Sequence, residues 1–130
     1  MADKTNYAQD RTLKYLLGIS PSTTVYLGLL TVAGTDASAG TEVNSGVETN
    51  YARQEITFGA PVLDSGQYQT SSTNAITFGA AVSGYTVVQE AIFDAPTGGN
   101  RLYYKTVTNQ PVAVGNAYYR PAGSVVVRES

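Results

Sequence analysis

Residues 87–107 read VVQEAIFDAPTGGNRLYYKTV, and this stretch decides the fold. Residues 87–94 and 101–107 are rich in β-branched and aromatic residues, whereas residues 95–100 hold a proline, two glycines and an asparagine, which favour a turn. The pattern predicts a β-hairpin. Alternation along the first strand separates Val88, Glu90, Ile92 and Asp94 from Val87, Gln89, Ala91 and Phe93. Because both faces carry apolar residues, we expect the hairpin inside a sheet and not at its rim.

Short apolar or alternating runs flank the hairpin on both sides. They are residues 24–30, 51–59, 76–82, 112–119 and 124–128. With the hairpin they make about seven or eight short strands at spacings near ten residues, without helix-strand alternation. The sequence therefore predicts an all-β fold, an antiparallel β-sandwich or a jelly-roll-like barrel, with residues 1–130 in a single domain.

One seven-residue motif occurs twice, 20 residues apart. Ile56-Thr57-Phe58-Gly59-Ala60-Pro61-Val62 is nearly repeated by Ile76-Thr77-Phe78-Gly79-Ala80-Ala81-Val82. Two copies are too few for a solenoid. We interpret them as two strands that bury isoleucine and phenylalanine alike, so Phe58 and Phe78 are both expected in the core.

A single helix is expected near the N-terminus, within residues 5–18. Leu13, Leu16 and Leu17 share a helical face, Thr5 or Asn6 can cap the start, and Gly18 with Pro21 can end it. We expect this amphipathic helix to pack on one end of the sheet. A docking arm is the alternative.

Residues 33–50 form a long polar segment. They are almost entirely Ala, Gly, Ser, Thr, Asp, Glu, Asn and Val, which bury little area when a chain becomes ordered. We expect a mobile loop or a loose, irregular strand pair. Because long loops are uncommon unless they bind something, the segment is either a surface excursion or an arm ordered by a partner.

The composition disfavours several classes of function. The 130 residues include no cysteine and no histidine, which removes disulfides and imidazole-based triads. A net charge of −2 argues against nucleic acid or an anionic membrane as a partner. No run approaches the ~20 apolar residues of a membrane span, and the N-terminus lacks a signal-peptide pattern. We therefore expect synthesis and folding in a cytoplasm.

The carboxylates do not suggest chemistry. Glu90 and Asp94 lie four apart on a strand, roughly 13 Å from each other, beyond the about 5–10 Å of a glycosidase pair. We expect them to form charge pairs with Arg101 or Lys105 across the hairpin. Acidic residues in 33–50 lack the spacing of a calcium loop. The sequence thus predicts no catalytic residue, no metal site and no cofactor.

Ten tyrosines and the absence of tryptophan are a stronger signal. Tyr103-Tyr104 precedes Lys105, and Tyr118-Tyr119 precedes Arg120. Neighbours on a strand point to opposite faces, so one tyrosine of each pair should enter the core and the other should face outward. This arrangement favours a protein interface over a sugar site, and both over nucleic acid.

Several short motifs together resemble a family of small tailed-bacteriophage virion proteins, often labelled tail fibre proteins. In chain order they are Thr5-Asn6-Tyr7, Leu16-Leu17-Gly18, residues 25–31, 40–43, 51–54, 56–60 and 76–78, and residues 92–104. The resemblance implies a small β-rich structural protein of the virion, without catalytic residues to carry over. Where family members usually have a tryptophan before the central hairpin, this chain has Tyr85. The family label leaves placement on capsid or tail open.

The leading expectation is a capsid decoration or cement protein that binds the major capsid protein and stabilises the shell. A tail or tail-fibre component that binds tail proteins is the alternative, and a carbohydrate-binding adhesion module is the third. We expect homo-oligomers, with a trimer favoured. Six residues are candidates for partner contacts: Thr41, Glu42, Val43, Tyr104, Tyr119 and Arg120.

Overall fold

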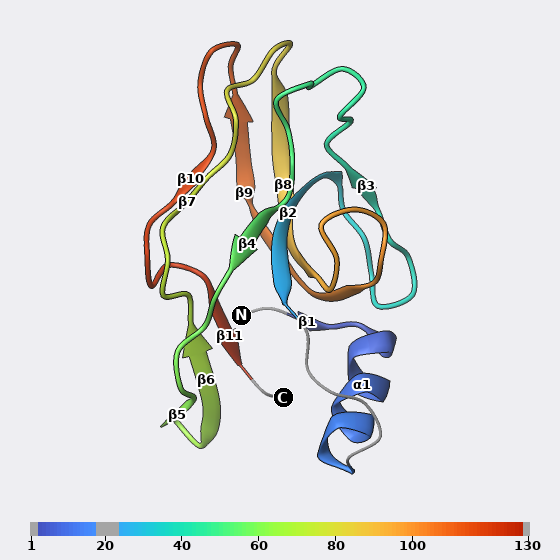
Figure 1. The fold of residues 1–130 in the computed structure, drawn as a ribbon, viewed down its shortest axis with the longest axis vertical. Coiled ribbons are helices and arrows are strands. Elements are labelled where there is room, and N and C mark those ends of the chain that lie inside the picture. The colour runs from blue at the N-terminus through green and yellow to red at the C-terminus, as the bar shows by residue number, and fades with distance from the viewer. Residues whose placement is uncertain (1–2, 18–23, 129–130) are drawn as a thin grey trace.

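The computed structural model describes residues 3–17 and 24–128. The central hairpin consists of β8 (Tyr85–Phe93) and β9 (Arg101–Val112), which stand side by side along the long axis (Figure 1). The other elements are β1 (Asp3–Lys4), α1 (Asn6–Leu16), β2 (Val25–Val32), β3 (Thr41–Glu42), β4 (Gln54–Ile56), β5 (Val62–Asp64), β6 (Gln67–Ser71), β7 (Ile76–Thr77), β10 (Tyr119–Arg120) and β11 (Val126–Arg128).

The largest sheet is antiparallel and has the order β1-β9-β8-β2-β3, with β4 also paired to β2. Strand β8 lies between β9 and β2, so the prediction of a hairpin inside the sheet is confirmed for its first strand. Among the described strands, β9 has a second neighbour, β1, only at Tyr103 and Tyr104, and the rest of it lies at the edge of the sheet. Two smaller antiparallel sheets, β10-β7 and β11-β6-β5, complete the fold. The all-β antiparallel sandwich with a short N-terminal helix is therefore confirmed.

A backbone seam joins the large sheet to the sheet of β6. Beyond β4, the Thr73 N–H donates to the Thr57 carbonyl at 2.8 Å, the Gly59 N–H donates to the Ser71 carbonyl at 3.2 Å, and Phe58 forms a bridge with Ser72. The chain thus passes from one layer to the other without losing backbone pairing. This seam closes the sandwich on the side of β4.

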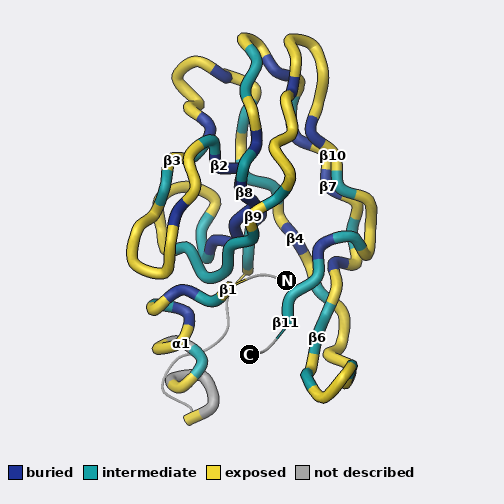
Figure 2. Tube along the Cα trace, turned by 180° about the vertical axis from the view of Figure 1, so that it is seen from behind, coloured by how far each residue is buried: buried dark blue, intermediate teal, exposed yellow. Residues whose placement is uncertain are grey.

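Many of the buried residues lie along β2 and β8, while most of the loops are exposed (Figure 2). The main cluster between the layers includes Leu27, Leu29, Ile92 and Val87. Alternation had placed Val87 on the face opposite Ile92. The register between β8 and β9 shifts between Val87 and Gln89, and this irregularity turns Val87 toward the main core instead.

A second, smaller cluster lies on the other face of the large sheet. It contains Leu30, Ala91 and Phe93, with Tyr104 packed against it. Strand β8 is consequently buried on both faces, and it carries two polar residues, Gln89 at 1% and Glu90 at 3% exposure. Such groups require internal partners, because a buried polar group without one costs about 1–3 kcal/mol.

The two copies of the repeated motif differ in burial. Phe78 is 2% exposed, stacked on Tyr51 with ring centroids 5.9 Å apart and in edge contact with Tyr118. Phe58 is only half-buried, because β4 ends at Ile56 and Phe58 lies at the seam beside the core. The prediction of full burial is confirmed for Phe78 and wrong for Phe58.

Helix α1 is held at its start by Thr5. The Thr5 hydroxyl accepts the Ala8 N–H at 3.1 Å and donates to the Arg101 carbonyl at 2.6 Å, which anchors the cap to β9. Among the helix side chains that the structure describes, Ala8 is buried and Leu13 is exposed, and Leu17, just after the helix, is exposed as well, so these two leucines do not pack on the sheet. The side chain of Leu16, the third leucine of the expected face, is not among those described. The predicted stop at Gly18 and Pro21 lies outside the described residues.

The repeated motif yields a first test. Phe78→Ala should lower the free energy of unfolding by about 3–5 kcal/mol, because it removes a ring enclosed by two others. Phe58→Ala should lower the free energy of unfolding by less than half that amount, because the ring of Phe58 is already partly exposed to solvent. Urea unfolding midpoints measure both, and equal losses would contradict the burial of the two rings described here.

Candidate partner-binding surface

Residues 33–50 are an ordered part of the large sheet. Strand β3 pairs with β2 through Leu30–Glu42 and Val32–Thr41, and the Val43 N–H donates to the Leu29 carbonyl at 3.0 Å. Residues 41–43 thus form a short, irregular strand pair with β2, one of the two forms expected for this segment. The anchors come from side chains outside the segment, which its own composition could not reveal.

The first anchor is the buried amide of Gln89. Its Oε1 accepts the Gly34 N–H at 2.9 Å and its Nε2 donates to the Gly34 carbonyl at 3.2 Å, so the amide pairs with backbone as a neighbouring strand would. A Cβ on Gly34 would lie 2.5 Å from the Ser38 carbonyl oxygen. Only glycine fits at this close approach.

The second anchor is Arg101, at the start of β9. Its guanidinium donates to the Thr35 carbonyl, and to the Ser38 carbonyl at 2.9 Å, and its Cζ lies 4.6 Å from the centre of the Tyr104 ring. The Tyr104 hydroxyl donates to Asp36. This hydrogen bond to a carboxylate raises the pKa of Tyr104 to about 12.

The third anchor is Arg53, whose side chain is 7% exposed. It binds both oxygens of Glu42 at 2.9 Å and donates to the Ala95 and Gly98 carbonyls at 2.9 and 2.7 Å. Its Cζ lies 3.5 Å from the centre of the Phe93 ring. Arg53 thereby ties β3 to the turn of the central hairpin.

Two further carboxylate contacts complete the attachment of the segment. The Tyr51 hydroxyl donates to Glu42 at 2.5 Å and accepts the Leu29 N–H at 3.0 Å. Burial, reinforced by this carboxylate, raises the pKa of Tyr51 far above its usual value. Glu48, also buried, accepts the Val82 and Ser83 N–H groups at 2.7 and 3.1 Å.

On the opposite side of the sheet, Glu90 joins β8 to β10. The Tyr118 hydroxyl donates to Glu90 at 2.6 Å, and the Arg120 Nε lies 3.3 Å from the same carboxylate oxygen. Burial and this bond raise the pKa of Tyr118. The expected pairing of Glu90 with Arg101 or Lys105 is wrong, because the carboxylate turns toward β10 in the core.

Asp94 also differs from its expected pairing. It accepts the Asn100 N–H at 2.7 Å and so closes the hairpin turn, rather than pairing with a cation across the strands. This is an ordinary role for aspartate at the start of a turn. Both hairpin carboxylates are therefore structural.

The six candidate contact residues do not form one surface. Four lie within residues 33–50 or bind to them. Thr41 is exposed, Glu42 forms an ion pair with Arg53, and Tyr104 donates a hydrogen bond to Asp36. Val43 is 4% exposed, so it offers no surface to a partner. The other two lie on β10. As predicted for neighbours on a strand, Tyr118 is buried and Tyr119 is 54% exposed.

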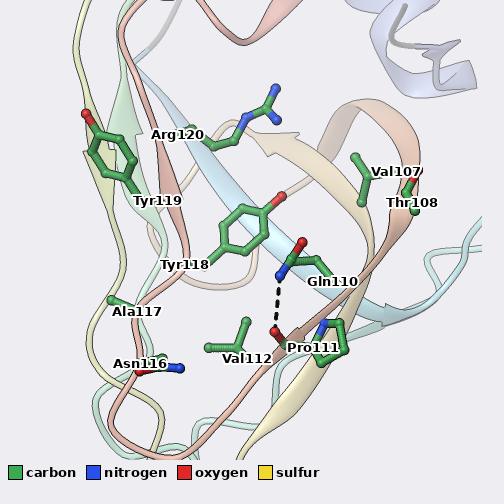
Figure 3. Close-up of a pocket in the computed structure, with 10 residues that line it drawn as sticks. All are labelled: Val107, Thr108, Gln110, Pro111, Val112, Asn116, Ala117, Tyr118, Tyr119 and Arg120. Atoms are coloured by element: carbon green, nitrogen blue, oxygen red, sulfur yellow. Dashed lines mark hydrogen bonds between the residues drawn. The ribbon is translucent and has the colours of Figure 1, made fainter.

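Beside β10 lies a groove of about 680 Å³ between β9 and residues 116–120 (Figure 3). Tyr118 points toward the groove in this view, whereas Tyr119 points away from it. Gln110 and Asn116 lie on opposite walls. Sequence reasoning missed both amides, because nothing in the sequence indicates that the chain separates here into two walls.

Within residues 3–17 and 24–128 there is no group of three acidic, histidine or cysteine side chains that could bind a metal ion. In the same part of the chain, no helix has the length and apolarity to cross a membrane.

The family model described as podophage GP4 fiber I protein gp80 matches residues 3–128. The chain belongs to this fibre protein family. The resemblance found from short motifs is thus confirmed, and the Gp80-family chain is a structural protein of the phage virion. No curated protein matches the chain significantly. In this Gp80-family protein, two of the six candidate contact residues, Glu42 and Tyr104, take part in the bonds that fasten residues 33–50 to the sheet.

The Arg53 contacts predict a stability defect. Arg53→Met should lower the free energy of unfolding by about 3 kcal/mol, because Glu42 would lose its bidentate partner in a largely desolvated site. Hydrogen exchange at residues 41–48 should accelerate. The exposed neighbour provides the control, since Thr41→Ala should be nearly neutral; a similar loss in both variants would show that Arg53 is not an anchor.

The tyrosine–carboxylate pairs predict an alkaline response. The pKa values of Tyr51, Tyr104 and Tyr118 are raised above the usual 10, so these pairs contribute their full stability below about pH 10 and lose it as pH rises through the folded-state values. Absorbance of tyrosinate should therefore show delayed ionisation in the folded protein. Asp36→Asn should bring the pKa of Tyr104 back toward 10, and an unchanged titration would argue against this pair.

Proposed function

We propose that the chain is a structural component of the tail fibre, attached to neighbouring tail proteins. The observation that carries this proposal is the match of residues 3–128 to a fibre protein family. The role is architectural and requires no catalysis or cofactor.

The packing of residues 33–50 also favours the tail over a cement role. The cement hypothesis relied on a free polar arm that could reach a neighbouring capsid subunit. That segment is bonded to Gln89, Arg53 and Arg101 of its own chain, so ordering it on a shell would require breaking these contacts.

Attachment and self-association are proposed for the end that carries α1 and the hairpin of β5 and β6, the lower end in Figure 1. Leu13 and Leu17 are exposed on the helix side, and Val62, Leu63 and Tyr68 on the hairpin. Apolar side chains exposed at one end are typical of protein interfaces. Copies of the chain would meet there, with a trimer as the expected form.

Placement can be tested on particles. Gold-labelled antibody against the protein should mark the tails of intact virions. Labelling distributed over the capsid surface would contradict the fibre proposal and restore the cement hypothesis.

Self-association can be tested on purified protein. Light scattering should report an oligomer, and Leu63→Asp should shift it toward monomer without lowering the melting temperature. Val114 is 65% exposed elsewhere, so Val114→Asp is the matched control and should leave the oligomer intact. A wild-type protein that remains monomeric at high micromolar concentration would exclude this interface.

A further inference from the structure

We propose that the groove between β9 and residues 116–120 is a binding site for a neutral oligosaccharide. Its volume of about 680 Å³ falls within the about 300–1,000 Å³ of small-molecule sites. The site could serve host attachment, and only that use rests on the proposed fibre role.

The groove exists because two successive stretches of chain separate. After β9 the chain turns at Gly115, which has a φ of +84°, and returns as residues 116–120. The returning stretch pairs with residues 78–81 and not with β9: the Phe78 N–H donates to the Tyr118 carbonyl at 2.9 Å and the Ala81 N–H to the Asn116 carbonyl at 2.8 Å. No backbone pairing therefore joins β9 to residues 116–120, whereas the seam joins the two layers by backbone pairing on the side of β4.

A polypeptide strand is a poor occupant for this opening. Beyond Tyr104, β9 has no second neighbour among the described strands. Along this free edge lie the charged Lys105 and Pro111, which has no N–H to donate. Between them, the pairing of β9 with β8 is irregular from Thr106 to Gln110. A charge, a bulge and a proline are the features by which natural sheets resist strand addition.

The lining chemistry matches sugar hydroxyls. The side chains of Thr108 and Asn116 have no hydrogen-bond partner among the described residues, and Gln110 donates only to its neighbour Pro111, at 3.3 Å. Amides and hydroxyls both donate and accept, as do sugar hydroxyls. Tyr118 and Val112 also line the groove but are 8% and 5% exposed, so a bound ligand would meet mainly polar side chains and be held by hydrogen bonds.

The charge of the groove selects against anionic ligands. Arg120 is the cation that lines it, and this guanidinium is already paired with Glu90 and donates to the Ser124 carbonyl at 2.8 Å. A phosphate or sulfate would need an unpaired cation or several converging N–H groups. Neutral hexose chains require neither.

Binding can be measured by NMR on the full-length protein, with maltohexaose, cellohexaose and chitohexaose as the probes. At least one should shift amide signals within residues 107–112 and 116–120, with a dissociation constant on the order of 1 mM, because the site is open and its hydrogen bonds replace those to water. Heparin oligosaccharide tests the charge argument and should not compete.

Gln110→Ala and Asn116→Ala should each weaken binding by about 2- to 10-fold, since each loses one pair of hydrogen bonds. Gln67→Ala, on β6, is the matched control and should bind like wild type. The proposal is overturned if none of the three neutral probes shifts these signals, if the shifts map elsewhere, if heparin binds the groove more tightly, or if the control loses as much affinity.

Oligosaccharide binding is independent of where the protein sits on the particle. Antibody labelling of the capsid would remove the fibre role while leaving oligosaccharide binding to the purified protein unaffected. Labelling of the tail without any binding would retain the fibre role and reject the groove.

Discussion

Two adjacent polar residues buried on opposite faces of one strand determine how the layers of this protein are held together. Gln89 and Glu90 lie in β8, which is covered on both sides, and neither can be left without partners in such a position. Gln89 bonds the backbone of Gly34 and so fixes residues 33–50 over one face. Glu90 binds Tyr118 and Arg120 and so fixes β10 over the other. Their backbone places the two side chains in opposite directions, and each secures a different layer.

Local pattern was sufficient to predict the main strands and the fold class. Alternation and turn residues identified the hairpin of residues 87–107, the strand within residues 24–30, and the opposed pair Tyr118 and Tyr119. The fold class came from the number and spacing of such runs. The resemblance to the family came from short motifs that occur in order between residues 5 and 104, and the family model matches residues 3–128.

The features that escaped prediction depend on contacts between distant residues. The order of residues 33–50 relies on Gln89, Arg53 and Arg101, which lie outside the segment, so its own composition indicated mobility. A register shift turns Val87 toward the main core instead of the face that alternation had assigned to it. The seam leaves Phe58 half-buried, although the repeated motif predicted that it would be buried like Phe78. The polar groove was likewise hidden, because it arises where residues 116–120 pair with 78–81 instead of β9.

These constraints agree with an architectural role in the virion. The polar segment that looked free to clamp a capsid neighbour is engaged within its own chain, whereas apolar residues remain exposed at the end formed by α1 and the β5–β6 hairpin. Exposed apolar side chains at one end and an open polar groove beside β10 are features that the proposed fibre role could use. The groove and the interface lie on different elements, so one copy could use both.

Hydrogen exchange, followed by mass spectrometry on two variants of β8, tests most directly whether Gln89 and Glu90 fasten separate layers. Gln89→Met should accelerate exchange in residues 33–43 and leave residues 116–120 unchanged, while Glu90→Gln should do the reverse, because each side chain holds one layer. If either variant loosened both regions equally, or if neither changed the exchange of its own region, the separate roles of these two residues would be contradicted.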